Sequence, residues 1–340
     1  MHPSLSTSGL LRVYHRAAFA LFLAALAAAP QVRGQVVAQR ENAVVRATVT
    51  SVETSPGANG WRYLTAAVHL QNLTKQPLIL GVERQKISST DDRRNRYAII
   101  EVRGIGEVAG GRLDPKFVLP AGGGGDALFE MRWRGDRNAL FGTIFDFTLP
   151  VRVILPVAGG QHKLDAEHLM TFTGLKAGHM VTPKGAETLA ANTVNAGPFT
   201  LQITRLTPSI SGNRRLHMAT LAARVKNTSD KPLTLAYEGA SSFGIDDQGN
   251  RYAYGTAGTH DTSFSGIGIL TRTQADPRFV LAPGEARDVQ FTVIRRLGRE
   301  PAGTLLTYYV ALAQLEVLPG NQIRTVRQYS LAFPRMSGLN

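Results

Sequence analysis

The chain contains two divergent copies of one pattern, and this repeat constrains its fold more than any other feature. Residues 91–97 (DDRRNRY) return 155 positions later as residues 246–252 (DDQGNRY). Farther along, residues 114–119 (DPKFVL) return 162 positions later as residues 276–281 (DPRFVL). Long-period self-similarity with the order kept is the mark of a duplicated structural unit. We therefore predict that the chain folds as two copies of one module.

The change of offset from 155 to 162 places a seven-residue insertion in the second copy. It falls at residues 257–263 (AGTHDTS), whose small and polar composition is typical of a loop. Insertions are tolerated in surface loops far better than inside strands. The length change therefore agrees with two copies of one folded unit.

Apolar residues alternate with polar ones at matched positions of the two copies, which predicts half-buried strands. One predicted strand of the first copy and its counterpart in the second carry apolar residues at every second position, namely Leu64, Ala66, Val68 and Leu70 against Ala219, Leu221, Ala223 and Val225. A later strand does the same, with Ala127, Phe129 and Met131 against Val289, Phe291 and Val293. The same face is expected to be buried in both copies.

Each copy is long enough for a sandwich of seven to nine short strands, so the fold class we predict is all-β. The expected boundaries are a signal peptide at residues 1–34, a first β-sandwich domain at 43–175, a linker at 176–196 and a second β-sandwich domain at 197–335. The linker holds the only plausible short helical piece, residues 186–191 (AETLAA).

The second copy resembles the immunoglobulin-like extracellular modules of secreted bacterial proteins of unknown function. The resemblance covers residues 200–295 and rests on residues 227–233 (NTSDKPL), 246–252 (DDQGNRY) and 281–284 (LAPG). The first copy departs from it, since Arg93 and Arg94 stand where a turn glycine is expected. The resemblance implies two tandem immunoglobulin-like domains with an exported role in binding or assembly, and no activity.

The first 34 residues have the organisation of a cleaved secretory signal. Arg12 and Arg16 precede an apolar run at residues 17–29, which is too short to span a bilayer. No later stretch offers a transmembrane anchor, so we expect a periplasmic or secreted protein. The chain has no cysteine, which excludes disulfides, thiol catalysis and a lipidated cysteine. An exported chain without cysteine indicates a bacterial source.

The mature chain is strongly basic. It carries +10, the formal +13 of the full chain less the three arginines of the signal segment, which has no acidic residue. Outside the cytoplasm, the expected anionic counterparts are an acidic polysaccharide or an acidic envelope protein, and not nucleic acid. A solvated basic surface without a specific ligand is the alternative. The sequence does not define the oligomeric state.

The sequence contains no recognisable catalytic, cofactor-binding or metal-binding motif, so we expect no enzyme, no cofactor and no metal. Residues 104–109 (GIGEVA) match a dinucleotide fingerprint only superficially, because a Gly-Gly pair follows where a helix is required. Asp246 and Asp247 lack the alternating acids of a calcium loop, and we interpret them as part of a hairpin turn. The one local cluster that could hold a metal is His162 and His168 with acids between them, if a hairpin brings both rings to one side.

Arginines cluster in predicted turns and at predicted strand ends, where binding residues are common. A guanidinium can bind two oxygens of a sulfate, phosphate or carboxylate at once. The candidate anion-binding residues are Arg93, Arg94, Arg96, Arg132, Arg134, Arg214, Arg215, Arg295 and Arg296. Trp133 lies among them, but it continues the apolar face of Phe129 and is expected in the core. Asn72 and Asn227 begin glycosylation patterns that we interpret as turns.

These observations favour an exported, non-enzymatic binding or scaffold protein of the bacterial envelope. Its basic loops would contact an anionic glycan or a protein partner. Two alternatives stay open: an envelope hydrolase or metal-dependent enzyme that uses His162 and His168, and a purely structural spacer whose arginines affect solubility alone.

Overall fold

The computed structural model describes residues 38–110, 112–136, 139–181, 192–211, 215–254, 264–298 and 300–338. The predicted signal peptide, the insertion at 257–263 and the helical piece at 186–191 lie outside these residues. In the described part, helical geometry occurs only in short 3-10 turns, at Ala58–Gly60, Arg84–Lys86, Ala158–Gly160, Gly239–Ser241 and Pro319–Asn321. The described residues form one compact unit.

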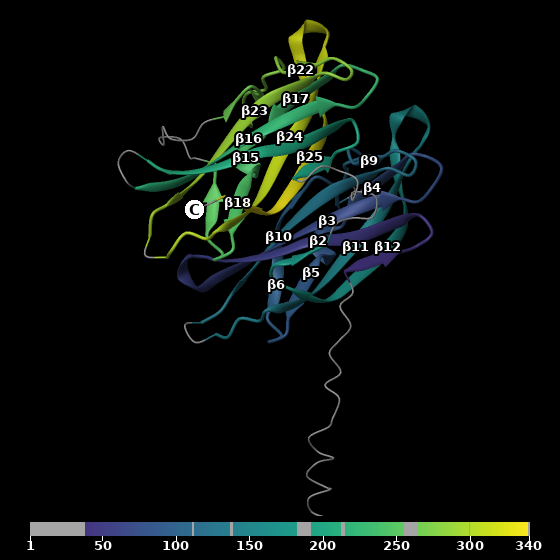
Figure 1. The fold of residues 1–340 in the computed structure, drawn as a ribbon. Helices are drawn as coiled ribbons and strands as arrows, with labels where there is room; N and C mark the ends of the chain where they lie inside the picture. The colour runs from purple at the N-terminus through teal and green to yellow at the C-terminus, as the bar shows by residue number, and fades with distance from the viewer. Residues whose placement is uncertain are drawn as a thin grey trace, which may run out of the picture. The chain divides into compact units, whose positions relative to one another are not determined.

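The first copy folds into a hydrogen-bonded sheet of 13 strands (Figure 1). Its strands are β1 (Gln39–Glu41), β2 (Val45–Pro56), β3 (Trp61–Asn72), β4 (Leu78–Val82), β5 (Ser88–Asp91), β6 (Arg96–Arg103), β7 (Gly106–Ala109), β8 (Arg112–Leu113), β9 (Val118–Leu119), β10 (Gly124–Arg134), β11 (Ile144–Pro156), β12 (His162–Lys176) and β13 (His179–Met180). The path runs β1-β2-β3-β10-β6-β5-β11-β4-β7-β8, with β12 on β11, β13 on β2 and β9 on β4.

The second copy repeats this topology in a sheet of 12 strands. Its strands are β14 (Thr193–Asn195), β15 (Phe199–Ile210), β16 (Leu216–Asn227), β17 (Leu233–Tyr237), β18 (Phe243–Asp246), β19 (Arg251–Ala253), β20 (Phe264–Ser265), β21 (Gly268–Ile269), β22 (Val280–Leu281), β23 (Ala286–Arg296), β24 (Leu305–Leu318) and β25 (Gln322–Ser337). The order is β14-β15-β16-β23-β19-β18-β24-β17-β21, with β25 on β24.

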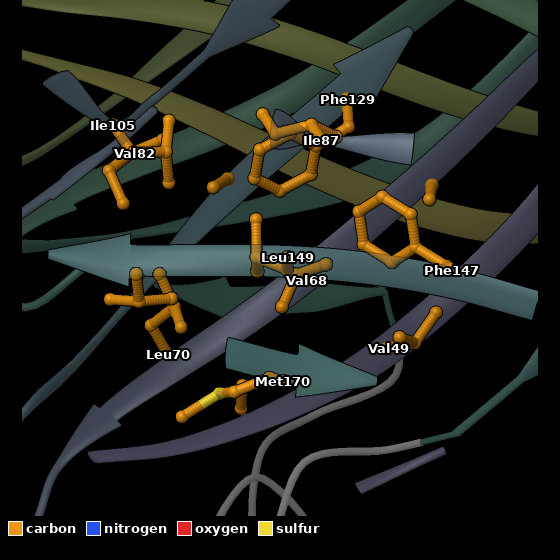
Figure 2. Close-up of a cluster of buried hydrophobic side chains, with 14 of the residues drawn as sticks. Val49, Val68, Leu70, Val82, Ile87, Ile105, Phe129, Phe147, Leu149 and Met170 are labelled. Carbon is orange, nitrogen blue, oxygen red and sulfur yellow. The ribbon is translucent and has the colours of Figure 1, made fainter. Parts of the chain in front are cut away.

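Each sheet closes around its own apolar core and so forms a two-layered sandwich. In the first copy, Phe129 of β10 lies 5.5 Å from Phe147 of β11, measured between ring centroids, although these strands are not hydrogen-bonded neighbours. Figure 2 shows Phe147, Leu149 and Val68 gathered in one buried cluster. The predicted all-β fold of two immunoglobulin-like sandwiches is therefore confirmed.

The predicted correspondence between the copies holds residue by residue. Phe129 is paired with Ala66 across β10 and β3, and Phe291 is paired with Leu221 across β23 and β16. Both phenylalanines have no exposed surface. Phe291 meets Tyr237 of the opposite layer at 4.7 Å between ring centroids. The matched alternation thus marked the inward face of the same strands in both copies.

The two sandwiches share a small buried cluster, which we call the junction. On the first sandwich, Ala67 of β3 and Leu128 of β10 point away from their own core, and they pack with Phe243, Ile245 and Tyr309 of the second sandwich. All five residues are at most 3% exposed. The outward face of β3 and β10 is therefore covered by β18 and β24 along part of its length.

Polar groups extend the junction on both sides of this apolar cluster. The Ser51 and Tyr309 hydroxyls lie 3.1 Å apart, and Thr307 donates a hydrogen bond of 3.2 Å to the Glu53 carboxylate. Arg251 donates a hydrogen bond of 3.2 Å to Glu130 of the first sandwich. Every one of these contacts joins the two copies.

Glu53 is a buried carboxyl at the junction, only 9% exposed. Burial raises the pKa of Glu53 to about 7, against smaller opposing effects of the Thr307 hydrogen bond and nearby Arg335, while Asp247 adds to the rise. A carboxyl whose pKa is raised by folding binds more protons in the folded state than in the unfolded one. Its contribution to stability is fully present below its usual pKa of 4.5 and is lost as pH rises through about 7.

The core assignment predicts how Phe129→Ala affects stability. The change leaves a cavity in a closed core, and we expect the free energy of unfolding to fall by about 3–5 kcal/mol. Urea unfolding followed by tryptophan fluorescence measures it, since both tryptophans, Trp61 and Trp133, belong to the first sandwich. Leu169→Ala is the control, because Leu169 is 64% exposed. Equal effects of the two changes would contradict the assignment.

The pKa of Glu53 predicts a pH dependence that Glu53→Gln removes. Between pH 8 and pH 5, the wild type should gain up to about 3 kcal/mol of stability relative to the variant. Urea unfolding at a series of pH values gives the difference between the two proteins, in which contributions from histidines and other groups cancel. An unchanged pH profile in the variant would rule out Glu53 as the titrating group.

Candidate anion-binding surface

Five of the nine candidate arginines gather at one end of the first sandwich. Arg93 and Arg94 lie in the turn between β5 and β6, and Arg96 begins β6. Arg132 and Arg134 end β10, and Arg132 is paired with Ala98 of β6. Because β6 and β10 are antiparallel, the start of one lies beside the end of the other. All five side chains are exposed.

The turn that carries Arg93 and Arg94 is held by Asp91. The Asp91 carboxylate accepts hydrogen bonds from the backbone of Arg93, Asn95 and Gly142, all at 2.9 Å. Burial alone would raise the pKa of Asp91, but these hydrogen bonds and that of the Asn95 side chain outweigh it and lower the pKa. The arginines therefore project from an ordered turn.

Arg94 itself adopts the left-handed backbone conformation, with a φ of 66°. Its counterpart in the second copy is Gly249, with a φ of 81°. The glycine that the resemblance led us to expect is thus replaced by a residue in the same conformation, which costs about 1 kcal/mol or more in strain. Space also disfavours a side chain at Gly249, since a Cβ there would approach the Thr54 carbonyl oxygen to 3.2 Å.

The candidate arginines of the second copy are arranged differently. Arg215 and Arg296 are exposed at the end of the sheet where β16 begins and β23 ends, and the Leu297 amide donates to the Arg215 carbonyl. Arg214 lies outside the described residues. The candidate arginines that the structure describes therefore do not converge on one site, because each copy carries its own group.

Arg295 is not a surface residue, contrary to our expectation. It is 8% exposed, and its guanidinium lies over the Tyr252 ring at 5.6 Å from the centroid. Burial and then the Arg295 charge lower the pKa of neighbouring His217. Arg295 occupies the position that Trp133 holds in the first copy, 6.3 Å from Tyr97 between ring centroids. Both side chains thus fill the same place above an equivalent tyrosine.

Nine arginines of the described residues form ion pairs with carboxylates, and the exposed candidates are not among them. Within the described ranges, ion pairs involve Arg46, Arg84, Arg103, Arg152, Arg224, Arg251, Arg278, Arg287 and Arg324. The same ranges contain no ion pair of Arg93, Arg94, Arg96, Arg132, Arg134 or Arg296. These six guanidiniums keep donors available for an external anion.

The aspartate pairs of both copies have a structural role. The Asp246 carboxylate accepts backbone hydrogen bonds from Gln248, Asn250 and Gly303, and Asp247 accepts them from Thr304 and Leu305. These bonds tie the turn after β18 to the segment entering β24. The interpretation as a turn is confirmed.

His162 and His168 do not come together as the alternative of a metal site requires. Both lie on the single strand β12, six residues apart, and not on the two arms of a hairpin. Six residues of extended chain span roughly 20 Å, whereas ligands of one metal lie within a few ångströms of each other. Among the described residues there is no cluster of three or more His, Asp or Glu side chains that could hold a metal ion.

Three other sequence features are explained by the fold. A strand, β7, occupies residues 106–109, where a dinucleotide fingerprint would require a helix. Asn72 and Asn227 have no exposed surface, and their side-chain amides donate to backbone carbonyls within turns. Trp133 faces inward and packs against the first core, as predicted.

Trp61, which was not among the predicted site residues, belongs with the arginines. The Arg132 guanidinium lies over the Trp61 ring at 4.3 Å from its centroid, and that of Arg134 lies at 5.7 Å. The alternation of inward and outward residues along β3 is the sequence pattern that places Trp61 there. Because Leu64 and Ala66 face inward, Tyr63 and Trp61 must face outward, on the same side as Arg132 and Arg134.

In the part of the chain that the structure describes, no helix is long and apolar enough to cross a membrane. No protein-family model matches the sequence, and no curated protein matches it either. Among solved structures, the chain is similar to the YadV chaperone at 9% identity and a TM-score of 0.19, covering 85% of this chain and 98% of that one. It is also similar to the Pseudomonas aeruginosa CupB2 chaperone at 10% identity and a TM-score of 0.15, covering 79% and 92%. Scores this low support no inference about function.

Proposed function

We propose that the chain is an exported, non-enzymatic binding or scaffold protein of the bacterial envelope. Its partner is an anionic glycan or an acidic envelope protein, and its exposed arginines make the contact. The signal-like segment at residues 1–34 and the absence of cysteine support export to the periplasm or beyond.

One observation carries the proposal: six exposed arginines without ion-pair partners stand on turns and strand ends of closed sandwiches. Five of the six (Arg93, Arg94, Arg96, Arg132 and Arg134) gather at one end of the first sandwich, which sets them apart from the scattered exposed arginines elsewhere. A side chain fixed on a rigid scaffold loses less conformational entropy on binding than one on a flexible tail.

Arg94 adds support for a role in binding. A non-glycine residue in the left-handed conformation is disfavoured, and the second copy has glycine at the same position. An exposed arginine contributes nothing to the core that would offset this strain. Residues held in strained backbone conformations are enriched at functional sites.

The test compares two matched six-fold variants of the exported chain. In the first, Arg93, Arg94, Arg96, Arg132, Arg134 and Arg296 become Gln. In the second, the exposed cations Lys75, Arg112, Lys163, Lys176, Lys226 and Lys231 become Gln, which removes the same charge elsewhere. Binding to isolated envelope polysaccharide and to envelope protein extract is measured at low and at high salt.

We expect the wild type to bind at low salt and to dissociate at high salt, because exposed charges are screened. The arginine variant should lose at least ten times more affinity than the lysine-rich control. Equal losses would show that net charge alone drives binding, as for a structural spacer. No binding to either fraction at low salt would overturn the proposal.

A further inference from the structure

The outward face of the first sandwich has two parts with different surroundings. Toward one end, Ala67 and Leu128 are covered by the second sandwich at the junction. Farther along the same face of the same strands, Arg132 and Arg134 are exposed and Trp61 is half-buried. The second sandwich therefore covers one part of this face and leaves the other open.

In the open part, aromatic side chains of β3 lie directly across from cationic side chains of β10. Arg134 is paired with Trp61, and Arg132 with Tyr63, across β10 and β3. Arg96 lies at the same end of the neighbouring strand β6, beyond the pair of Arg132 with Ala98. Side chains two residues apart on a strand point the same way and lie about 7 Å apart. We call these five residues (Trp61, Tyr63, Arg96, Arg132 and Arg134) the Trp61 patch.

Trp61 restrains the two guanidiniums beside it. A guanidinium above an indole is attracted to the ring face, which fixes its position without using any of its N–H donors. Ordering an arginine before the ligand arrives lowers the entropy lost on binding. The next acid on this face of β10, Glu130, is already engaged by Arg251 at 3.1 Å. The patch thus presents positioned donors with no internal anion.

The second copy shows that the fold does not need this patch. Leu216 stands at the position of Trp61, and Ile294, which is 9% exposed, at that of Arg132. Arg134 and Arg96 do have basic counterparts, Arg296 and Arg251, but Arg251 is engaged by Glu130 at the junction. A feature required by the sandwich itself would be expected in both copies, so the patch has a role of its own.

We propose that the Trp61 patch is a binding site for an acidic polysaccharide. Carboxylate, sulfate or phosphate groups repeated along the glycan would contact Arg132, Arg134 and Arg96, with Trp61 as the positioning residue. Arg132 and Arg134, about 7 Å apart on β10, with Arg96 beside them, complement a linear chain of repeated anions. This inference rests on the proposed function and specifies its ligand class and site.

The experiment uses the exported chain and four polymers: polygalacturonate, heparin, neutral dextran and polyglutamate. Trp61→Leu introduces the residue of the second copy and keeps the net charge. The double change Arg132→Gln and Arg134→Gln removes two charges from the patch. The double change Lys226→Gln and Lys231→Gln is the control, removing two exposed charges from the second copy. Thermal unfolding checks that each variant is folded.

We expect Trp61→Leu to weaken binding of an acidic glycan about 2- to 5-fold with its salt dependence unchanged, since exposed cation–π contacts are of this size. The double arginine variant should weaken binding more and also reduce the salt dependence. The control should change affinity less than the double arginine variant, and dextran should not bind.

Two outcomes would overturn the inference while leaving the proposed function intact. The first is binding of acidic glycans that both patch variants affect no more than the control does. The second is binding of polyglutamate as tightly as of the acidic glycans, with the same sensitivity to Trp61→Leu, which would show a preference for an acidic polypeptide. If no anionic polymer and no envelope fraction binds at low salt, the proposed function fails as well.

Discussion

Burial of Phe243 and Tyr309 of the second sandwich against Ala67 and Leu128 of the first is the contact on which the rest of the structure depends. The guanidiniums of Arg251 and Arg103 flank the Phe243 ring at 3.8 and 5.3 Å from its centroid, and Arg103 belongs to the first sandwich. Without this contact, Ala67 and Leu128 would be exposed on the outer face of β3 and β10. With it, the exposed part of that face is reduced to its polar and aromatic end.

The junction joins non-equivalent surfaces of two homologous modules. A contact between non-equivalent surfaces can join one molecule to the next and so add further copies, because each module carries a version of both surfaces. Here the unused surfaces are polar. The first-copy counterparts of Phe243 and Tyr309 are Ser88 and Thr148, which pair with each other as the two aromatic residues do. The second-copy counterpart of Leu128 is Gln290. The exchange of apolar for polar residues restricts this contact to the one pair of surfaces within the chain.

The sequence predicted the inward faces well because alternation and the repeat report on the same physical quantity, burial of every second side chain. Phe129 and Phe291 were matched correctly from spacing alone, and so were the turns held by Asp91 and Asp246. The sequence predicted the outward faces poorly. An outward residue is buried only if another module covers it, which no local pattern records. Arg295 was therefore expected on the surface, and Trp61 was overlooked although its alternation with Leu64 placed it beside Arg132.

The central claim is that the junction makes the two sandwiches one cooperative unit. Replacing Phe243 with Ser and Tyr309 with Thr introduces the residues that the first copy holds at these positions, so each sandwich should still fold. Tryptophan fluorescence follows the first sandwich alone, and far-ultraviolet circular dichroism follows both. The urea unfolding curves from the two probes should coincide in the wild type and separate in the double variant. Curves that still coincide in the variant, or that already differ in the wild type, would contradict the claim.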